Sequence, residues 1–276
     1  MKFAICNETY ADWPLAKICD HVAACGYDGL ELAPFTLADD PSLLSVREAT
    51  AAGDTIRRSG LEVVGFHWLL VKPEGLHLST ADDVVRGRTV EFAKHLAQLC
   101  AAMGGRILVW GSPRQRSVPP RQDYQDAWAR ARDSLRQIAE TAGPLGVTVA
   151  LEPLGPAETN FINSAGEALR LLDEVDHPAC RLHLDVKAMC AETKPIPDII
   201  RSARSRLVHF HANDAQGRAP SSGAVDYVPI AAALAEIDYQ GYTSVEVFDY
   251  TPGPEAIASE SLAFLKQHFA SLESRL

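Results

Sequence analysis

Four residues that can bind a metal ion or transfer a proton each follow a short apolar run in the second half of the chain. They are Glu152, Asp185, His211 and Glu246. Such runs are typical of buried strands, and residues at the carboxyl ends of parallel strands gather at one edge of a sheet. The spacing therefore predicts that three carboxylates and one imidazole lie at the same level.

The three carboxylates of this predicted cluster would repel one another and lose their hydration, and both effects disfavour their charged forms. A divalent cation between them would offset these costs. Oxygen ligands with a single nitrogen suit Mn²⁺, Co²⁺ or Mg²⁺ better than the sulfur-rich sites that select structural zinc, although Zn²⁺ also accepts such ligands. We predict one divalent ion, Mn²⁺ in the first place, held by these four side chains.

Each of the four residues also has a structural explanation when it is taken alone. Glu152 could begin a loop, and Asp185 could cap the following helix. His211 could be a hydrogen-bonded core histidine, and Glu246 could pair with an arginine or a lysine. The shared position at the ends of successive strands favours a metal site over four separate structural roles.

The elements that must position these residues follow a regular alternation of short apolar runs and longer helical patterns. This alternation is typical of a parallel sheet covered by helices. The strands are predicted at Lys2–Cys6, Gly29–Ala33, Leu61–Phe66, Arg106–Val109, Val147–Leu151, Arg181–Leu184, Leu207–Phe210 and Thr243–Val245. Eight such units match the closure of a single (β/α)₈ TIM barrel, an α/β fold that we expect to form one domain over residues 1–276.

The helices are predicted from apolar residues at three- and four-residue spacing. They include Leu15–Ala24, Val84–Met103, Tyr124–Ala142, Ala165–Val175, Ile230–Ile237 and Glu255–Phe269. The loops after the strands are longer than those before them, as in a barrel whose active site lies on that side. An open doubly wound sheet is the rival architecture, but no strand is followed by a glycine-rich nucleotide-binding loop.

The composition limits the kinds of partner that this protein is expected to bind. The formal net charge of -10 repels a phosphate backbone, so nucleic acid is not expected as a partner. No apolar run is long enough to span a bilayer, and no signal-peptide pattern begins the chain, so we expect no membrane and a cytoplasmic location. The cysteines lack CxxC spacing and are predicted to be reduced thiols.

The segments that carry the four candidate ligands resemble those of the xylose isomerase-like barrel superfamily. Within it, they look most like the ketose 3-epimerases of the D-tagatose and D-psicose type, and the likeness covers nearly the whole chain. The segments are Leu151-Glu152-Pro153, His183-Leu184-Asp185, His209-Phe210-His211-Ala212-Asn213-Asp214 and Ser244-Val245-Glu246.

The resemblance implies a metal-dependent sugar isomerase or epimerase, most specifically a ketose 3-epimerase that acts through a metal-stabilised enediolate. The metal makes the hydrogen at C3 acidic. Glu152 is then expected to remove this hydrogen, and Glu246 to return a proton to the opposite face. The resemblance also implies that Glu158 and Arg218 bind a small sugar or polyol-derived ketone, and that the chain forms a homodimer or homotetramer.

One position departs from the epimerases, which carry a histidine three residues after the aspartate ligand to contact the substrate carbonyl. This chain has Ala188 there, and a methyl group cannot donate a hydrogen bond. Either Lys187 or His67 takes over this contact, or the substrate and the reaction differ. The alanine also distinguishes the chain from the related barrel endonuclease with three zinc ions, which needs further histidine and aspartate ligands.

Two residues at earlier strand ends are further candidates for contact with the substrate. His67 follows the third predicted strand, and Trp110 follows the fourth. A tryptophan at a barrel mouth can stack on the apolar face of a sugar, but it can equally fill the barrel as a core residue.

Two other functions compete with epimerisation. A lyase of the inosose or 3-dehydroshikimate dehydratase type would use the same enediolate to expel a neighbouring hydroxyl. A sugar-binding protein without turnover is the non-catalytic alternative, and the complete set of candidate ligands argues against it.

Overall fold

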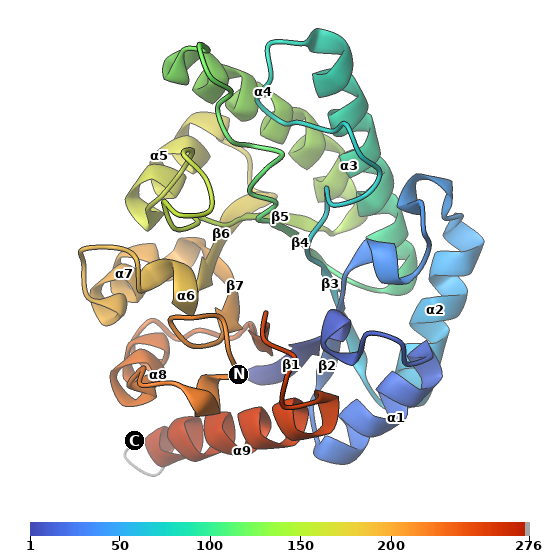
Figure 1. The fold of residues 1–276 in the computed structure, drawn as a ribbon, viewed down its shortest axis with the longest axis vertical. Helices are drawn as coiled ribbons and strands as arrows, with labels where there is room; N and C mark the ends of the chain where they lie inside the picture. The colour runs from blue at the N-terminus through green and yellow to red at the C-terminus, as the bar shows by residue number, and fades with distance from the viewer. Residues whose placement is uncertain (274–276) are drawn as a thin grey trace.

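The computed structural model describes residues 1–273, and its strands form a closed parallel barrel in the order β1 to β8. Figure 1 looks along the barrel, with the strands at the centre and the helices around them. The strands are β1 (Lys2–Cys6), β2 (Gly29–Leu32), β3 (Glu62–Phe66), β4 (Ile107–Trp110), β5 (Thr148–Leu151), β6 (Cys180–Asp185), β7 (Leu207–Ala212) and β8 (Tyr242–Val245). The predicted (β/α)₈ barrel is confirmed.

A helix follows every strand and packs on the outside of the barrel. The helices are α1 (Leu15–Cys25), α2 (Val46–Arg58), α3 (Asp83–Met103), α4 (Tyr124–Ala142), α5 (Ala165–Val175), α6 (Val186–Met189), α7 (Ile196–Ala203), α8 (Tyr227–Glu236) and α9 (Pro254–Glu273). Their inward faces and the strands share one continuous apolar core. Because the strands are buried on both faces, they read as apolar runs in the sequence.

The turns that lead from helices back to strands are short, and several close on glycine. Gly26 ends α1 with a φ of 92°, and Gly104 ends α3 with a φ of 91°. A residue with a Cβ is strained in this left-handed region, so glycine is the natural helix terminator here.

Four helices differ from the sequence-based expectation, and α6 and α7, which both lie between β6 and β7, were not singled out. The apolar spacing did not single out α2, although Ser45 and Glu48 form a capping box at its start, with each side chain accepting from the other residue's backbone N–H. Helix α8 begins before the predicted Ile230, because the Asp226 side chain accepts from Val228 N and caps it at that point.

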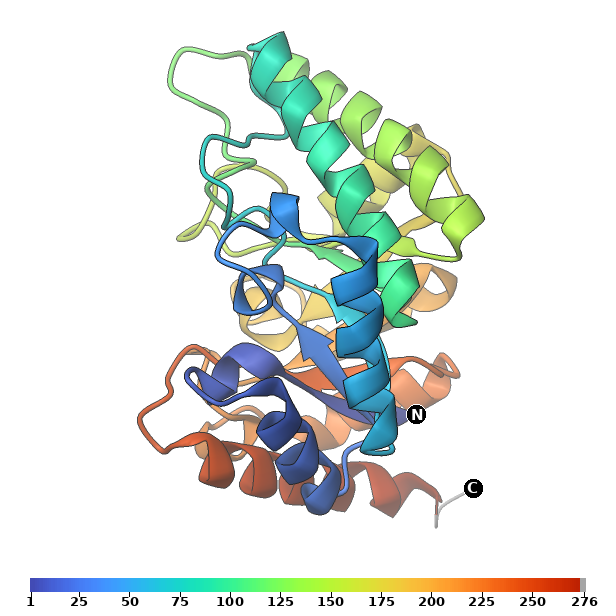
Figure 2. The ribbon, with the colours of Figure 1, turned by 90° about the vertical axis from the view of Figure 1, so that its right-hand side faces the viewer.

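The longer loops that follow the strands gather at one end of the barrel. In Figure 2 they lie on the left, whereas the N-terminus, which leads into β1, lies on the right. This end therefore carries the residues at the carboxyl ends of the strands. Within residues 1–273, no helix combines the length and apolar character needed to cross a membrane.

Candidate metal centre and active site

The four predicted ligands meet at the carboxyl ends of the strands. Glu152 directly follows β5, Asp185 ends β6, His211 lies in β7, and Glu246 directly follows β8. One ligand atom from each lies within 4.8 Å of the others, and all four residues are buried. Parallel strand pairing places these residues at a similar height in the barrel. Asp185 lies opposite His211, and His211 lies opposite Ser244 of β8.

The electrostatics of this cluster fit a divalent cation. Burial raises the pKa of Glu152 well above its ordinary value, and Glu246 and Asp185 raise it further. Burial and the Glu246 carboxylate also raise the pKa of Asp185 to about 6. The protein's own groups therefore do not stabilise all three negative charges, whereas a divalent ion among three carboxylates and an imidazole would.

The protein holds two of these carboxylates in fixed orientations. Asp185 Oδ1 accepts from Ala188 N at 2.8 Å, and Oδ2 accepts from the Asn213 amide at 2.6 Å. Asp185 therefore caps the short helix α6 and faces the cluster at the same time. Glu246 Oε1 accepts from the Trp68 indole N–H at 2.9 Å, so the tryptophan after β3 orients a carboxylate after β8.

Beneath the cluster lies a layer of buried polar side chains. Glu31 of β2 is 0% exposed, and its carboxylate contacts His209 at 2.8 Å and His211 at 3.1 Å. Burial alone would raise the pKa of Glu31, but the two histidines hold it well below its ordinary value. Glu31 was not predicted from the sequence, although a charged residue inside an apolar strand is a usable signal.

A second buried residue that the sequence analysis missed lies in the loop after β4. The Arg116 side chain is 0% exposed, and its Nη1 donates to the Glu152 carbonyl at 2.5 Å. This bond ties the loop after β4 to the start of the loop after β5. No local pattern in the sequence marks Arg116 as buried.

A cavity of about 390 Å³ opens directly above the cluster. Glu152 and Glu246 line it, and Trp68, Leu154 and Phe248 supply apolar walls. The Trp68 and Phe248 rings are stacked, with centroids 5.9 Å apart and planes 16° apart. A buried acidic floor under apolar walls suits a small polar ligand with one apolar face.

Three predicted substrate residues lie at or beside this cavity. His67 lines it, although its Nε2 is 2.7 Å from the Glu8 carboxylate. Glu158 also lines it, and Lys187 of α6 forms an ion pair with Glu158 at 2.6 Å. The lysine next to Ala188 therefore reaches the cavity wall through an acidic partner.

Trp110, in contrast, does not line the cavity and is 1% exposed within the apolar core. Successive side chains of a strand point to opposite faces. Val109 and Gly111 line the cavity, so Trp110 between them points outward to the helices. The prediction that Trp110 forms a wall for the substrate assigned its side chain to the wrong face of the strand.

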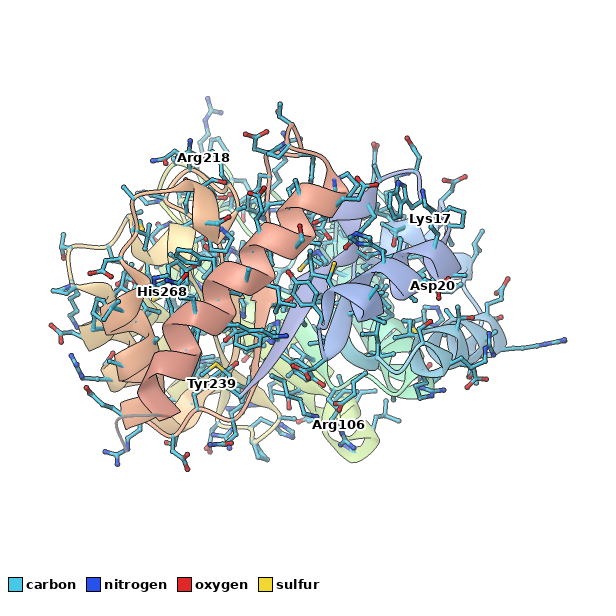
Figure 3. All side chains as sticks on the ribbon, turned by 90° about the horizontal axis from the view of Figure 1, so that it is seen from below. Lys17, Asp20, Arg106, Arg218, Tyr239 and His268 are labelled. Carbon is cyan, nitrogen blue, oxygen red and sulfur yellow. The ribbon has the colours of Figure 1, made fainter. Side chains whose placement is uncertain are left out.

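Arg218 is not brought to the cavity either. Figure 3 places it at one end of the barrel, opposite Arg106 and Tyr239, which precede β4 and β8. Its Nε donates to Asp214 Oδ2 at 2.7 Å, and its own backbone N donates to Asp214 Oδ1. The arginine therefore stabilises its own loop, because its positive charge is paired with the Asp214 carboxylate.

Comparison with known proteins identifies relatives along most of the chain. The sequence profile of the family described as xylose isomerase-like TIM barrel matches residues 19–268. A D-psicose 3-epimerase of Enterocloster bolteae is 30% identical over 248 residues, which cover 88% of this chain and 79% of that enzyme. An L-ribulose 3-epimerase of Mesorhizobium japonicum is 31% identical over 175 residues, but this match covers only 62% of the chain and 58% of that enzyme.

The fold also matches solved structures. A D-psicose 3-epimerase from Clostridium cellulolyticum H10, solved with D-tagatose, superposes with a TM-score of 0.85 at 23% identity, over 98% of this chain and 99% of that one. At this identity the superposition shows a shared fold, and the sequence matches show the relationship. The chain belongs to the xylose isomerase-like TIM barrel family.

Proposed function

We propose that this chain is a metal-dependent sugar epimerase, specifically a ketose 3-epimerase. The observation that carries the proposal is the convergence of Glu152, Asp185, His211 and Glu246 below one cavity. The matched sequences named D-psicose 3-epimerase and L-ribulose 3-epimerase support it. We further propose that residues 1–276 act as one domain.

The metal would be held by these four side chains, and Mn²⁺ is the proposed ion, with Co²⁺, Mg²⁺ and Zn²⁺ as alternatives. When bound, a divalent ion would polarise the substrate carbonyl and acidify the hydrogen on the neighbouring carbon. Of the four ligands, only Glu152 and Glu246 also line the cavity. These two carboxylates can therefore reach a substrate from within the same cluster.

Proton transfer is assigned to these two glutamates. They follow β5 and β8, whereas the other two ligands belong to β6 and β7 between them. Glu152 removes the proton from C3 on one face of the sugar, and Glu246 returns a proton on the other face. Removal of the proton on one face and its return on the other invert the configuration at C3 without any other change in the substrate.

The substrate is proposed to be a small sugar or a polyol-derived ketone. Trp68 and Phe248 would contact its apolar face, while Glu158 and Lys187 would bind its hydroxyl or carbonyl oxygens. Because Ala188 cannot donate a hydrogen bond, we assign the contact to the substrate carbonyl to Lys187, with His67 as the alternative. We also propose a homodimer or homotetramer in the cytoplasm.

The reaction is tested by incubating the Mn²⁺-loaded protein in D₂O with ketoses, inososes and keto-acids. Epimerisation incorporates deuterium at C3 without loss of water, which NMR detects. A conjugated enone absorbance would instead identify the lyase alternative. This alternative is tested because Ala188 stands where the epimerases have a histidine. Binding of metal and sugar without any solvent exchange would identify a binding protein and overturn the proposal.

The Trp68→Phe variant tests the indole that orients Glu246. Phenylalanine keeps an aromatic ring beside Phe248 but removes the N–H that donates to the carboxylate. Hydrogen bonds to charged groups contribute about 1.5–3 kcal/mol, so kcat should fall by about 10- to 100-fold while KM changes less. Steady-state kinetics check this, and an unchanged kcat would contradict a role in orienting Glu246.

The Lys187→Met variant tests whether Lys187 makes the contact with the substrate carbonyl that a histidine makes in the epimerases. Methionine has a similar length but cannot donate a hydrogen bond, so kcat/KM should fall by about 10- to 100-fold. Lys194→Met is the matched control, because Lys194 is an exposed lysine in the same connection between β6 and β7. Equal activity of the two variants would assign the carbonyl contact to another group.

A further inference from the structure

The buried carboxylate of Glu31 contacts a candidate metal ligand from below. Glu31 lies in β2, which only β1 separates from β8 around the closed barrel, and it is 0% exposed. Its Oε1 is 3.1 Å from His211 Nε2. The other ring nitrogen, Nδ1, is 3.1 Å from Glu246 Oε2 and so faces the carboxylate cluster.

These two contacts, together with the position of the candidate metal ligands, determine which nitrogen of His211 is free for a metal. A neutral imidazole has one N–H and one bare nitrogen, and only the bare nitrogen can coordinate an ion. An ionised carboxylate accepts hydrogen bonds and cannot donate them. Both ring nitrogens face a carboxylate at 3.1 Å, but Nδ1 faces Glu246, which is itself a proposed metal ligand. An ion bound in this cluster would replace the proton on Nδ1, so the proton of His211 belongs on Nε2, where Glu31 accepts it.

A second histidine holds Glu31 in place. His209 Nε2 lies 2.8 Å from Glu31 Oε2, so the two carboxylate oxygens receive hydrogen bonds from two different rings. Cys6 and His67 also offer ligand atoms within 4.8 Å of this carboxylate, which would permit a separate ion. Because His209 and His211 already occupy both oxygens of Glu31, the geometry favours the hydrogen-bonded arrangement over a second metal.

We propose that Glu31 is a positioning residue that fixes His211 in the Nε2–H tautomer and directs its Nδ1 to the metal. This inference rests on the metal site of the proposed function. Carboxylates that accept from a metal-bound histidine typically strengthen metal affinity by about 10- to 100-fold. Glu31 would thus act on the ion through His211, without contact with the substrate.

Metal affinity gives the first test. Mn²⁺ binding is titrated by electron paramagnetic resonance of free Mn²⁺ with the unaltered chain and with Glu31→Gln, Glu31→Asp and Glu62→Gln. We expect one ion per chain, a Kd about 10- to 100-fold higher for Glu31→Gln, and partial recovery in Glu31→Asp, which keeps the charge. Glu62→Gln is the control, because Glu62 of β3 is exposed and pairs with Lys2.

The tautomer of His211 gives the second test, which does not require a Glu31 variant to fold. In the unaltered chain, labelled with ¹⁵N-histidine and loaded with diamagnetic Zn²⁺, NMR should show His211 protonated at Nε2 and bare at Nδ1. The resonance is assigned by its absence from His211→Asn. Protonation at Nδ1 would overturn the role of Glu31, even if Glu31→Gln proved unstable.

The outcomes separate this inference from the proposed function. If the unaltered chain binds Mn²⁺ and Glu31→Gln binds it equally tightly, the inference about Glu31 is wrong while the metal site stands. A second tightly bound ion that is lost in Cys6→Ala would replace the inference with a site at Cys6, Glu31 and His67. If the unaltered chain binds no divalent ion, the metal site itself is overturned, and the role of Glu31 with it.

Discussion

Glu152→Gln and Glu246→Gln are each expected to lower kcat for epimerisation by about 10²- to 10⁴-fold while the barrel remains folded. Glutamine keeps the size of the side chain, but its amide neither takes up nor delivers the substrate proton. The change also removes one negative charge from a cluster of three carboxylates, so it relieves repulsion in the ion-free fold. Activity should therefore fall much more than stability.

The two substitutions can be distinguished by isotope exchange. If Glu152 removes the proton from one epimer and Glu246 from the other, each variant should lose deuterium exchange in D₂O from one epimer more completely. Glu174→Gln is the matched control, because Glu174 also accepts from an indole N–H, that of Trp128, at 2.7 Å but lies outside the cluster. Its kcat should match that of the unaltered chain, and circular dichroism should show that all three variants are folded. Retention of most activity by either cluster variant would refute the mechanism with two glutamates.

Removal of the metal should abolish turnover, and Mn²⁺ should restore it. Chelation with EDTA leaves Glu152, Asp185 and Glu246 without a counter-ion, so the chain should also melt at a lower temperature than the loaded form. The measurements are kcat and the melting temperature before chelation, after chelation and after Mn²⁺ is added back. Full activity of a protein that elemental analysis shows to be free of metal would exclude a metal-dependent reaction.

The stabilisation by the ion should increase as the pH rises from 5 to 7. In the ion-free fold, burial and Glu246 raise the pKa of Asp185 from 3.8 to about 6. A raised carboxyl pKa contributes stability that is fully present below pH 3.8 and is lost as the pH rises through about 6. At pH 5 the ion must displace this proton from Asp185, whereas at pH 7 the carboxyl is already ionised. The ion therefore binds more favourably at pH 7.

The difference in melting temperature between loaded and ion-free protein reports the protons that the ion displaces, from Asp185 and from Glu152, whose pKa burial raises well above its ordinary value. His183 and His209, whose pKa values burial lowers, are present in both forms. The gain in melting temperature from Mn²⁺ should therefore be larger at pH 7 than at pH 5. A gain that is equal at both pH values, or larger at pH 5, would show that the ion does not displace protons from these carboxylates.

The sequence by itself determined the barrel and the membership of the ligand cluster. Apolar runs mark strands that are buried on both faces, and parallel pairing brings the ends of successive strands to one level. Glu152, Asp185, His211 and Glu246 could therefore be grouped from their positions after such runs. The start of α2 was also encoded locally, by Ser45 and Glu48, but its apolar stripe was too weak to single it out.

Only the tertiary structure decided which way individual side chains point and which distant residues meet. The outward direction of Trp110 depends on the phase of β4 in the closed barrel, and Arg218 is bound by an aspartate of its own loop rather than by a substrate site. Glu31 and His211 are 180 positions apart, and Trp68 and Glu246 are 178 apart. Contacts of this kind arise when a barrel closes, and a local pattern of residues carries no information about them.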